Sequence, residues 1–203
     1  MSNENKDGRP APRKASAARD TKETKISASL ALDPGPVKVD TGIGFLDHML
    51  TALAFHGGLS LELTCRGDLN VDDHHTAEDC GIVLGDLIRE ALGNRSGIRR
   101  FASAYAPLDE ALARAVVDVS GRPYAFTDLK LERDTIGTLA CENVPHILQS
   151  LAFHAGITLH VEVLYGDNDH HKVEAAFKAL ALAFKSAFEI TGAGTPSTKG
   201  VLE

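Results

Sequence analysis

Two stretches of this chain repeat each other: Asp72-Asp73-His74-His75-Thr76-Ala77-Glu78-Asp79 and Asn168-Asp169-His170-His171-Lys172-Val173-Glu174. Each contains a pair of histidines followed, after two residues, by a glutamate. In a helix that begins at the pair, the first histidine and the glutamate are four residues apart and the second histidine and the glutamate are three apart, so they share a helical face. An imidazole and a carboxylate on one face can hold a divalent cation. Two copies in one small chain therefore predict a two-metal site.

The other histidine of each pair must then point elsewhere, toward a second metal or toward ligands of the opposite copy. The aspartate before the pair fits a helix N-cap. With imidazoles and a carboxylate but no cysteine nearby, the donor set suits Mn, Fe, Ni or Zn better than a thiolate-loving ion. The alternative interpretation is that each pair is a polar surface turn that caps a helix. Recurrence of the motif in a matching context favours the metal site.

The repeat extends well beyond the histidines. Residues 53–61 match residues 151–159 at a constant offset of 98, and at that offset His48 falls on His146. The histidine motif recurs at an offset of 96, because one loop of the second copy is two residues shorter. This is an internal duplication, and it predicts a local pseudo-two-fold axis near which ligands from both halves meet. The spacing leaves open whether the halves meet within one subunit or across subunits. The candidate metal ligands are His48, His74, His75, Glu78, His146, His170, His171 and Glu174.

Apolar periodicity gives each half the order strands, helix, strand, helix, which predicts an α+β fold of two duplicated half-domains. We expect a flexible tail at residues 1–20, which contain no apolar residue larger than Ala after Met1. The first half then spans residues 21–97, the second half residues 98–192, and a C-terminal tail residues 193–203. Residues 33–36 are typical of a turn from which a strand returns. Strands are expected at 21–32, 37–39, 59–63, 112–119, 124–131 and 158–163, and helices at 45–55, 78–92, 143–154 and 173–189.

Composition limits the partners of the chain. Its 203 residues are 43% hydrophobic and 24% charged, as in an ordinary soluble globular protein. The net charge of -7 disfavours a nucleic-acid partner, and lysines interrupt the longest apolar runs, so we expect no membrane span. Cys65, Cys80 and Cys141 are odd in number and lack a CxxC pair, which predicts reduced core thiols. With no secretory signal we expect a cytoplasmic protein; a transit peptide is the rival interpretation, weakened by Glu4 and Asp7.

Several motifs, taken together and in their order along the chain, resemble those of imidazoleglycerol-phosphate dehydratase. Besides the two histidine stretches they include Gly44-Phe45-Leu46-Asp47-His48-Met49-Leu50, Pro107-Leu108-Asp109-Glu110-Ala111-Leu112, Ser120-Gly121-Arg122-Pro123 and Pro196-Ser197-Thr198-Lys199-Gly200. The resemblance implies a hydro-lyase of histidine biosynthesis that converts imidazole glycerol phosphate to imidazole acetol phosphate, with two manganese ions per active site. It also implies that each half is a four-stranded sheet with two helices on one face. The implied assembly is a homo-oligomer of trimers, a 24-subunit shell with its sites at subunit interfaces.

Carried over position by position, the resemblance assigns metal binding to the eight candidates above. It assigns phosphate binding to four residues and acid–base catalysis to Glu23. Planar guanidinium groups suit a phosphate, and two of the four residues would lie on a tail that closes over it. The predicted phosphate-binding residues are Arg100, Arg122, Ser197 and Lys199.

The implied reaction is chemically demanding because the hydrogen to be removed, on the carbon bearing the middle hydroxyl, is not acidified by a carbonyl. An imidazole bound between two metals favours imidazolate, which expels the adjacent hydroxyl and makes the neighbouring proton acidic enough for a carboxylate base. Two rival functions use the same residues. One is a dinuclear metallohydrolase, which makes a hydroxide nucleophile, and the other is a non-catalytic shell protein assembled by metal. Turnover of imidazole glycerol phosphate separates the three.

Overall fold

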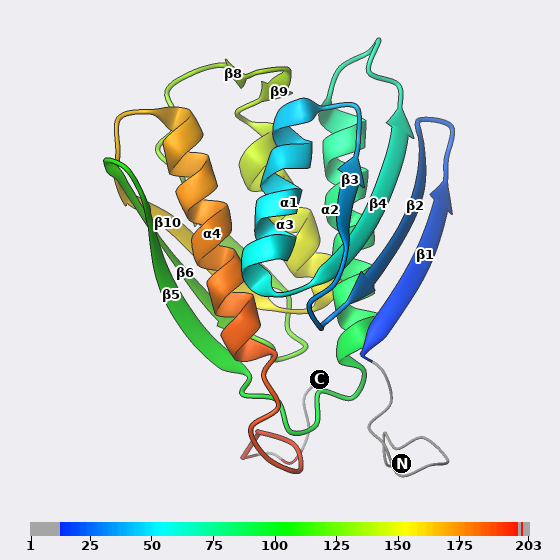
Figure 1. Cartoon of the computed structure of the whole chain (residues 1–203), viewed down its shortest axis with the longest axis vertical. Coiled ribbons are helices and arrows are strands. Elements are labelled where there is room, and N and C mark those ends of the chain that lie inside the picture. Colours follow the sequence, from blue (N-terminus) through cyan, green and yellow to red (C-terminus); the bar gives the residue numbers. More distant parts are fainter. Residues whose placement is uncertain (1–12, 199, 201–203) are drawn as a thin grey trace.

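Two four-stranded sheets enclose a layer of four helices (Figure 1). This computed structural model describes residues 13–198 and residue 200. The helices are α1 (Gly44–Gly57), α2 (His74–Leu92), α3 (Asn143–Ala155) and α4 (Asp169–Ala187). The strands are β1 (Lys14–Asp20), β2 (Thr24–Ala31), β3 (Val37–Asp40), β4 (Ser60–Gly67), β5 (Phe101–Leu108), β6 (Ala111–Asp118), β7 (Tyr124–Asp128), β8 (Thr135–Ile136), β9 (Leu139–Ala140) and β10 (Thr158–Tyr165).

The two sheets have the same topology. The first has the order β1-β2-β4-β3 and the second β5-β6-β10-β7. In each, the first three strands pair antiparallel and the last joins in parallel. Helices α1 and α2 pack on the first sheet, and α3 and α4 pack on the second. The predicted α+β fold, with a four-stranded sheet and two helices in each duplicated half, is confirmed.

Matching helix ends also mark the duplication. Gly58 and Gly156 follow α1 and α3 with a φ of 65°, the left-handed region that glycine occupies without steric cost. Each glycine N–H donates to the backbone carbonyls three and four residues before it. The chain therefore turns from α1 into β4 and from α3 into β10 in the same way.

The core lies between the helices and the sheets. Because α2 contacts α3 and α1 contacts α4, every helix packs both on its own sheet and on a helix of the other half. Met49, Leu87, Phe177 and Phe184 are fully buried in this layer. Burial of such a side chain contributes about 1.5–3 kcal/mol. None of the helices in the described part of the chain is long and apolar enough to cross a membrane.

The expected flexible tail at residues 1–20 is wrong for its last part. Residues 14–20 form β1, which pairs with β2 from Lys14 opposite Ala31 to Asp20 opposite Lys25. The inward-facing Ala15 is buried, since α2 packs against this strand. The inward-facing residues of β1 are two alanines and Arg19, which pairs with Asp79 of α2, so the strand has little apolar signal in the sequence. Residues 1–12 lie outside the described residues.

Three strands depart from the sequence-based prediction. Residues 37–39 are predicted to return beside the preceding strand, but β3 pairs in parallel with β4, with Val37 opposite Leu61. The strand predicted at residues 124–131 ends earlier, at Asp128, and β7 lies parallel to β10. The strand β5 is missing from the prediction, because its exposed side chains, Phe101 and Tyr105, are larger and more apolar than its inward-facing alanines.

The second half carries an additional segment between β7 and α3. Residues 129–142, which include β8 and β9, stand where the first half has only residues 41–43. Figure 1 shows β8 and β9 beside the ends at which α1 and α3 begin. Asp73 accepts a hydrogen bond from a backbone N–H of β9 at 2.7 Å, and Asp169 accepts from two consecutive N–H groups of the segment at 2.8 and 2.7 Å. Equivalent aspartates of the repeat thus fasten the segment at both ends.

Candidate metal centre

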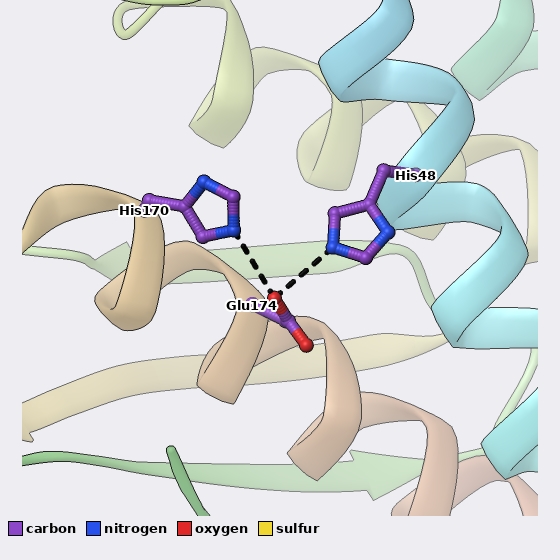
Figure 2. A group of neighbouring side chains, drawn as sticks. All are labelled: His48, His170 and Glu174. Carbon is purple, nitrogen blue, oxygen red and sulfur yellow. Dashed lines mark hydrogen bonds and ion pairs between the residues drawn. The ribbon is translucent and has the colours of Figure 1, made fainter. Parts of the chain in front are cut away.

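One set of metal-ligand side chains lies where α1 and α4 meet (Figure 2). His48 projects from α1, whereas His170 and Glu174 come from the start of α4 and are four residues apart. Oε2 of Glu174 is 3.1 Å from Nε2 of His48 and 3.2 Å from Nε2 of His170. One ligand atom from each residue lies within 4.8 Å of the other two. These residues, here the α1–α4 group, come from both halves of the chain.

A second set has the same design where α2 and α3 meet. His74 and Glu78 lie four residues apart on α2, and His146 comes from α3. Nε2 of His146 is 3.1 Å from Oε1 of Glu78, and the rings of His74 and His146 stack with centroids 4.9 Å apart. The three potential ligand atoms again lie within 4.8 Å of one another. These residues form the α2–α3 group, which is likewise shared between the halves.

The second histidine of each pair belongs to neither group. Nδ1 of His75 is 3.1 Å from a carboxylate oxygen of Asp68, and its Nε2 is 3.7 Å from Oε1 of Glu23. Nδ1 of His171 is 2.8 Å from Oε2 of Glu110. Hydrogen bonds with these carboxylates raise the pKa of both histidines. The four-residue spacing therefore builds each group, whereas the three-residue spacing does not bring the second histidine into it.

Two of the carboxylates around the histidines are strongly acidic. Burial opposes the ionisation of Glu174, but hydrogen bonds from Lys178, at 2.7 Å, and from His48 outweigh it and lower its pKa to about 2. The pKa of Glu110 is also lowered to about 2, first by a hydrogen bond from the backbone N–H of Asn168 and then by His171. Both carboxylates, Glu174 and Glu110, are therefore ionised at neutral pH, the form in which a carboxylate binds a cation.

The donor atoms of both groups fit a divalent cation. Two imidazole nitrogens and one carboxylate oxygen converge in each, and three protein ligands leave coordination positions open. Nitrogen and oxygen donors without sulfur suit Mn, Fe, Ni or Zn. The groups thus have the chemistry that a catalytic metal needs.

The residue two positions before the first histidine of each pair caps the helix that begins there. Oδ1 of Asp72 accepts the N–H of His74 at 2.9 Å, and Oδ1 of Asn168 accepts the N–H of His170 at 2.9 Å. The aspartate immediately before each pair was the expected cap, but Asp73 makes no capping bond with its side chain and instead fastens the 129–142 segment. The cap and the fastening point are therefore adjacent residues in each copy of the motif.

Arg100, a predicted phosphate-binding residue, lies at the far end of α4. Its N–H donates to the carbonyl of Ala187, the last residue of that helix. Its guanidinium pairs with both carboxylate oxygens of Asp118, at 2.7 and 3.2 Å, and donates to the carbonyl of Pro196 at 2.8 Å. Because α4 rises 1.5 Å per residue, about 20 Å separates this end from Glu174.

The other predicted phosphate-binding residues gather near Arg100 or lie outside the described residues. The side chain of Arg122 is 62% exposed, and its guanidinium is 3.7 Å from Asp118. Ser197 follows Pro196 in the C-terminal tail, and Lys199 lies outside the described residues. Within the described part of one chain, Arg100 therefore lies far from that chain's own metal-ligand groups, and Arg122 lies beside the same aspartate as Arg100.

Glu23 lies in the turn that leads into β2, at the histidine end of the molecule. Its N–H donates to Oγ1 of Thr21 at 3.1 Å, and its carbonyl accepts the N–H of Asp68 at 3.1 Å. Its carboxylate is 53% exposed and lies beside His75. The turn thus presents a solvent-accessible carboxylate near the start of α2, but outside the α2–α3 group.

Sequence reasoning missed the residues that surround the ligands. Asp68 and Glu110 face the second histidines, Asn143 bonds to His74, and Lys178 pairs with Glu174. Only the contact of Lys178 could have been inferred from the sequence, because Lys178 lies four residues after Glu174 on a predicted helix. The other contacts join positions whose separation in the sequence carries no periodicity.

The fold and the groups define a class: an internally duplicated α+β protein with two equivalent sets of two histidines and one glutamate, each set drawn from both halves. A family model described as imidazoleglycerol-phosphate dehydratase matches residues 41–184. The chain belongs to this family, and it is a hydro-lyase. The resemblance inferred from the motifs is confirmed, and the metallohydrolase and the non-catalytic shell lose their support.

Named relatives match nearly the whole chain. Imidazoleglycerol-phosphate dehydratase of Schizosaccharomyces pombe is 53% identical over 215 residues, which cover 94% of this chain and 100% of the relative. The Saccharomyces cerevisiae enzyme is 51% identical, with 93% and 98% covered. Crystal structures of the enzymes from Staphylococcus aureus and from Pyrococcus furiosus, the latter in complex with (S)-C348, are each 38% identical with a TM-score of 0.80. They cover 88% and 92% of this chain, and 99% and 100% of their own.

Proposed function

We propose that this hydro-lyase dehydrates imidazole glycerol phosphate to imidazole acetol phosphate in histidine biosynthesis, using two divalent cations per active site. The relatives' names support the substrate. The observation that carries the metal requirement is the pair of groups at which two histidines and a glutamate from both halves converge. Manganese is our choice among the ions that nitrogen and oxygen donors suit.

The chain's own residues divide the work. The α1–α4 and α2–α3 groups would hold the cations, which as Lewis acids would lower the pKa of the substrate's imidazole. Glu23 would take the proton from the carbon that bears the middle hydroxyl, because Glu78 and Glu174 already lie among ligand nitrogens. The exposure of the Glu23 carboxylate supports this role, since it can approach a substrate.

The substrate site on this proposal is shared between copies of the chain. From its ring to its phosphorus the extended substrate spans about 7 Å by ordinary bond lengths, much less than the roughly 20 Å of α4 between Glu174 and Arg100's neighbour Ala187. Arg100, Arg122, Ser197 and Lys199 of one copy would therefore bind the phosphate of a substrate held at the metals of another. His75 and His171, which face away from their own groups, would complete the metal coordination of a neighbouring copy. A homo-oligomer of trimers, reaching 24 subunits, is the assembly we propose.

We also propose a cytoplasmic location. The three cysteines, Cys65, Cys80 and Cys141, are free and buried, which suits a reducing compartment.

Turnover of imidazole glycerol phosphate by chelator-treated protein, with and without added Mn²⁺, tests the proposal. We expect Mn²⁺ to restore formation of imidazole acetol phosphate. Glu23→Gln should lower kcat about 10²- to 10⁴-fold, the usual contribution of a general acid–base group. Glu90→Gln, an exposed glutamate near the end of α2, is the control and should retain activity. Full turnover without a divalent cation would refute the metal requirement, and an active Glu23→Gln would refute the assignment of the base.

A further inference from the structure

The two metal-ligand groups are equivalent by duplication, but their surroundings differ. The difference is readable residue by residue, because the offsets of 96 and 98 place each neighbour of one group on its counterpart in the other. Two such pairs of neighbours touch the ligands themselves. One touches the glutamate and the other touches a histidine.

The glutamates differ in whether a cation already pairs with them. In the α1–α4 group, Nζ of Lys178 lies 2.7 Å from Oε1 of Glu174, one helical turn further along α4. At the offset of 96 the counterpart of Lys178 is Ile82, which carries no charge. The lysine therefore neutralises the only carboxylate of the α1–α4 group and occupies one of its oxygens, whereas the ion pair of Glu78 in the described part of the chain is with a ligand histidine, His146.

The histidines differ in what orients their rings. In the α2–α3 group, Nδ1 of His74 is 3.0 Å from Oδ1 of Asn143, an amide oxygen that can only accept. This bond keeps the proton on Nδ1 and leaves the lone pair of Nε2 available to a metal. At the offset of 98 the counterpart of Asn143 is Phe45, whose ring lies 5.0 Å from that of His170. A phenyl ring offers no such acceptor, so it neither selects the tautomer of His170 nor increases its basicity.

From these two differences we infer that the groups bind divalent cations with unequal affinity, the α2–α3 group being the tighter site and the α1–α4 group the weaker, exchangeable one. The inference rests on the proposed metal function of both groups. Its two causes are independent and act in the same direction. A lysine beside a ligand carboxylate repels a divalent cation, and loss of a hydrogen-bond partner behind a ligand histidine typically lowers metal affinity 10- to 100-fold.

One difference acts in the opposite direction. The side chain of Glu174 is 13% exposed and that of Glu78 is 36% exposed, so a cation at the α1–α4 group would interact with its carboxylate in a medium of lower dielectric constant. The same medium, however, strengthens the repulsion from Lys178, which is itself only 20% exposed. Burial therefore increases the attraction and the repulsion together, and the ordering of the sites holds.

Equilibrium dialysis of the chelator-treated protein against Mn²⁺, with free Mn²⁺ measured by electron paramagnetic resonance, tests the inference. We expect two classes of site, one of each per chain, whose dissociation constants differ at least about tenfold. His146→Ala should abolish the tighter class and His48→Ala the weaker class. A single class of two equal sites per chain, or loss of the tighter class in His48→Ala, would overturn the inference. Absence of bound Mn²⁺ would overturn the metal proposal itself and is thus distinguishable.

Exchanging the counterpart residues shows whether the named neighbours cause the difference. Lys178→Ile gives the α1–α4 group the neighbour that the other group has, and should tighten the weaker class about tenfold. Ile82→Lys should weaken the tighter class by a similar factor. Lys185→Ile removes an exposed lysine further along the same helix and is the matched control, expected to leave both classes unchanged. If Lys178→Ile shifts neither class, or shifts both as Lys185→Ile does, the assigned cause is refuted.

Discussion

Asp169 and Lys172 form an ion pair that is almost completely buried. The side chains are 2% and 3% exposed, and Nζ of Lys172 lies 2.9 Å from Oδ1 of Asp169. Removing one partner of such a pair leaves an uncompensated charge away from water, which typically costs about 3–5 kcal/mol. We therefore predict that Asp169→Asn lowers the free energy of unfolding by that amount, measured by denaturant titration of the assembled protein. The loss of stability should be accompanied by loosening of the 129–142 segment, because two backbone N–H groups of this segment donate hydrogen bonds to Asp169.

The control for this prediction is the exposed pair between Arg99 and Glu189, whose side chains are 48% and 55% exposed. Glu189→Gln should change the free energy of unfolding by less than about 1 kcal/mol, since solvent screens surface ion pairs. If the two substitutions changed the free energy of unfolding equally, burial of the Asp169–Lys172 pair would not determine how much this pair stabilises the fold.

Asp169 should also make stability depend on pH. Burial alone raises its pKa, but hydrogen bonds from the N–H of Arg133 and from Lys172 outweigh it and hold the pKa below the ordinary 3.8. A carboxyl group whose pKa is depressed by folding contributes its full stability above the unfolded value and loses it as the pH falls through the folded value. The gap in unfolding free energy between the native chain and Asp169→Asn should therefore be constant from pH 7 to about 5 and shrink below about pH 4. A gap that widens with acid would contradict the sign.

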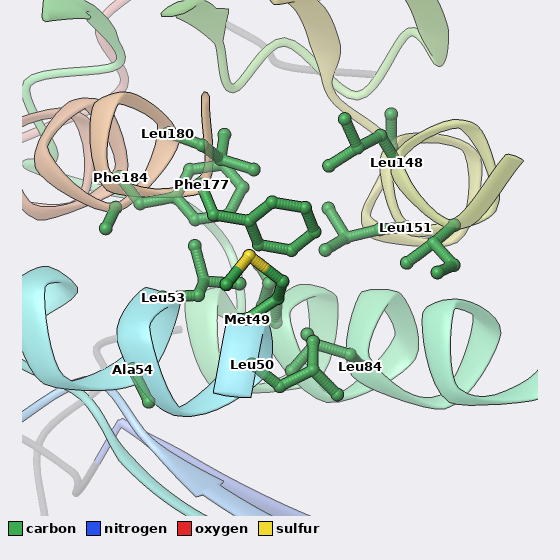
Figure 3. Close-up of a cluster of buried hydrophobic side chains, with 14 of the residues drawn as sticks. Met49, Leu50, Leu53, Ala54, Leu84, Leu148, Leu151, Phe177, Leu180 and Phe184 are labelled. Carbon is green, nitrogen blue, oxygen red and sulfur yellow. The ribbon is translucent and has the colours of Figure 1, made fainter. Parts of the chain in front are cut away.

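At the scale of elements, α2 and α3 approach so closely that glycine is required between them. Figure 3 shows Leu84, Leu148 and Leu151 at the side of this contact. A Cβ added at Gly85 would meet the backbone oxygen of Leu151 at 2.6 Å and Cβ of His154 at 2.6 Å. Since neither can move without shifting α3, we predict that Gly85→Ala costs about 1–3 kcal/mol of stability. By moving α3 away from α2, it should also weaken Mn²⁺ binding at the α2–α3 group more than at the α1–α4 group.

Gly44→Ala is the matched control, because the added Cβ meets nothing within 4 Å and the residue begins a helix. The free energy of unfolding of Gly44→Ala should stay within about 1 kcal/mol of the native value. If Gly85→Ala were as harmless as Gly44→Ala by thermal and denaturant unfolding, the close approach of α2 and α3 would not be a requirement of the fold.

Sequence periodicity predicted the helices better than the strand partners. Each helix has a stripe of apolar residues and a local stop signal, such as Gly58 after α1 and Gly156 after α3, so its existence follows from nearby residues. Pairing of a strand depends on elements far away in the chain. The turn at residues 33–36 looks like that of a hairpin, yet β3 does not pair with β2. It lies on the far side of β4 and pairs with β4 in parallel. The strand β1 was missed because its inner face carries two alanines and an arginine and no large apolar side chain.

At the scale of the whole molecule, the sequence pattern singles out the histidines and glutamates of the two candidate groups, but it does not show how they are grouped. The repeat identified His48 and His146 through a constant offset, but nothing in the spacing shows that His48 joins Glu174 of the other half. That exchange arises because α1 packs on α4 and α2 on α3. The distance between the arginines and the metal-ligand groups was equally hidden, since Arg100 meets the end of α4 through a tertiary contact that no local sequence pattern shows.

This separation makes a prediction about mixed oligomers. If each substrate site takes Glu23 from one copy and Arg122 from another, then Glu23→Gln and Arg122→Ala impair different copies at the same site. Each variant alone should be inactive. Co-assembled at equal amounts after dissociation with chelator and reassembly with Mn²⁺, about a quarter of the sites would draw both residues from unimpaired copies, and about a quarter of the native kcat per chain should return.

The control is a mixture of the double variant, Glu23→Gln with Arg122→Ala, and the native chain in the same proportion. It places both defects on one copy, yet the shared site still has a one-in-four chance of receiving two native residues, so the same recovery of about a quarter is expected. Sites contained within one chain would behave differently. The mixture of single variants would then stay inactive, while the mixture with the double variant would retain about half of the native activity. Comparing the two mixtures thus distinguishes a site between copies from a site within one, independently of how tightly either metal-ligand group binds its cation.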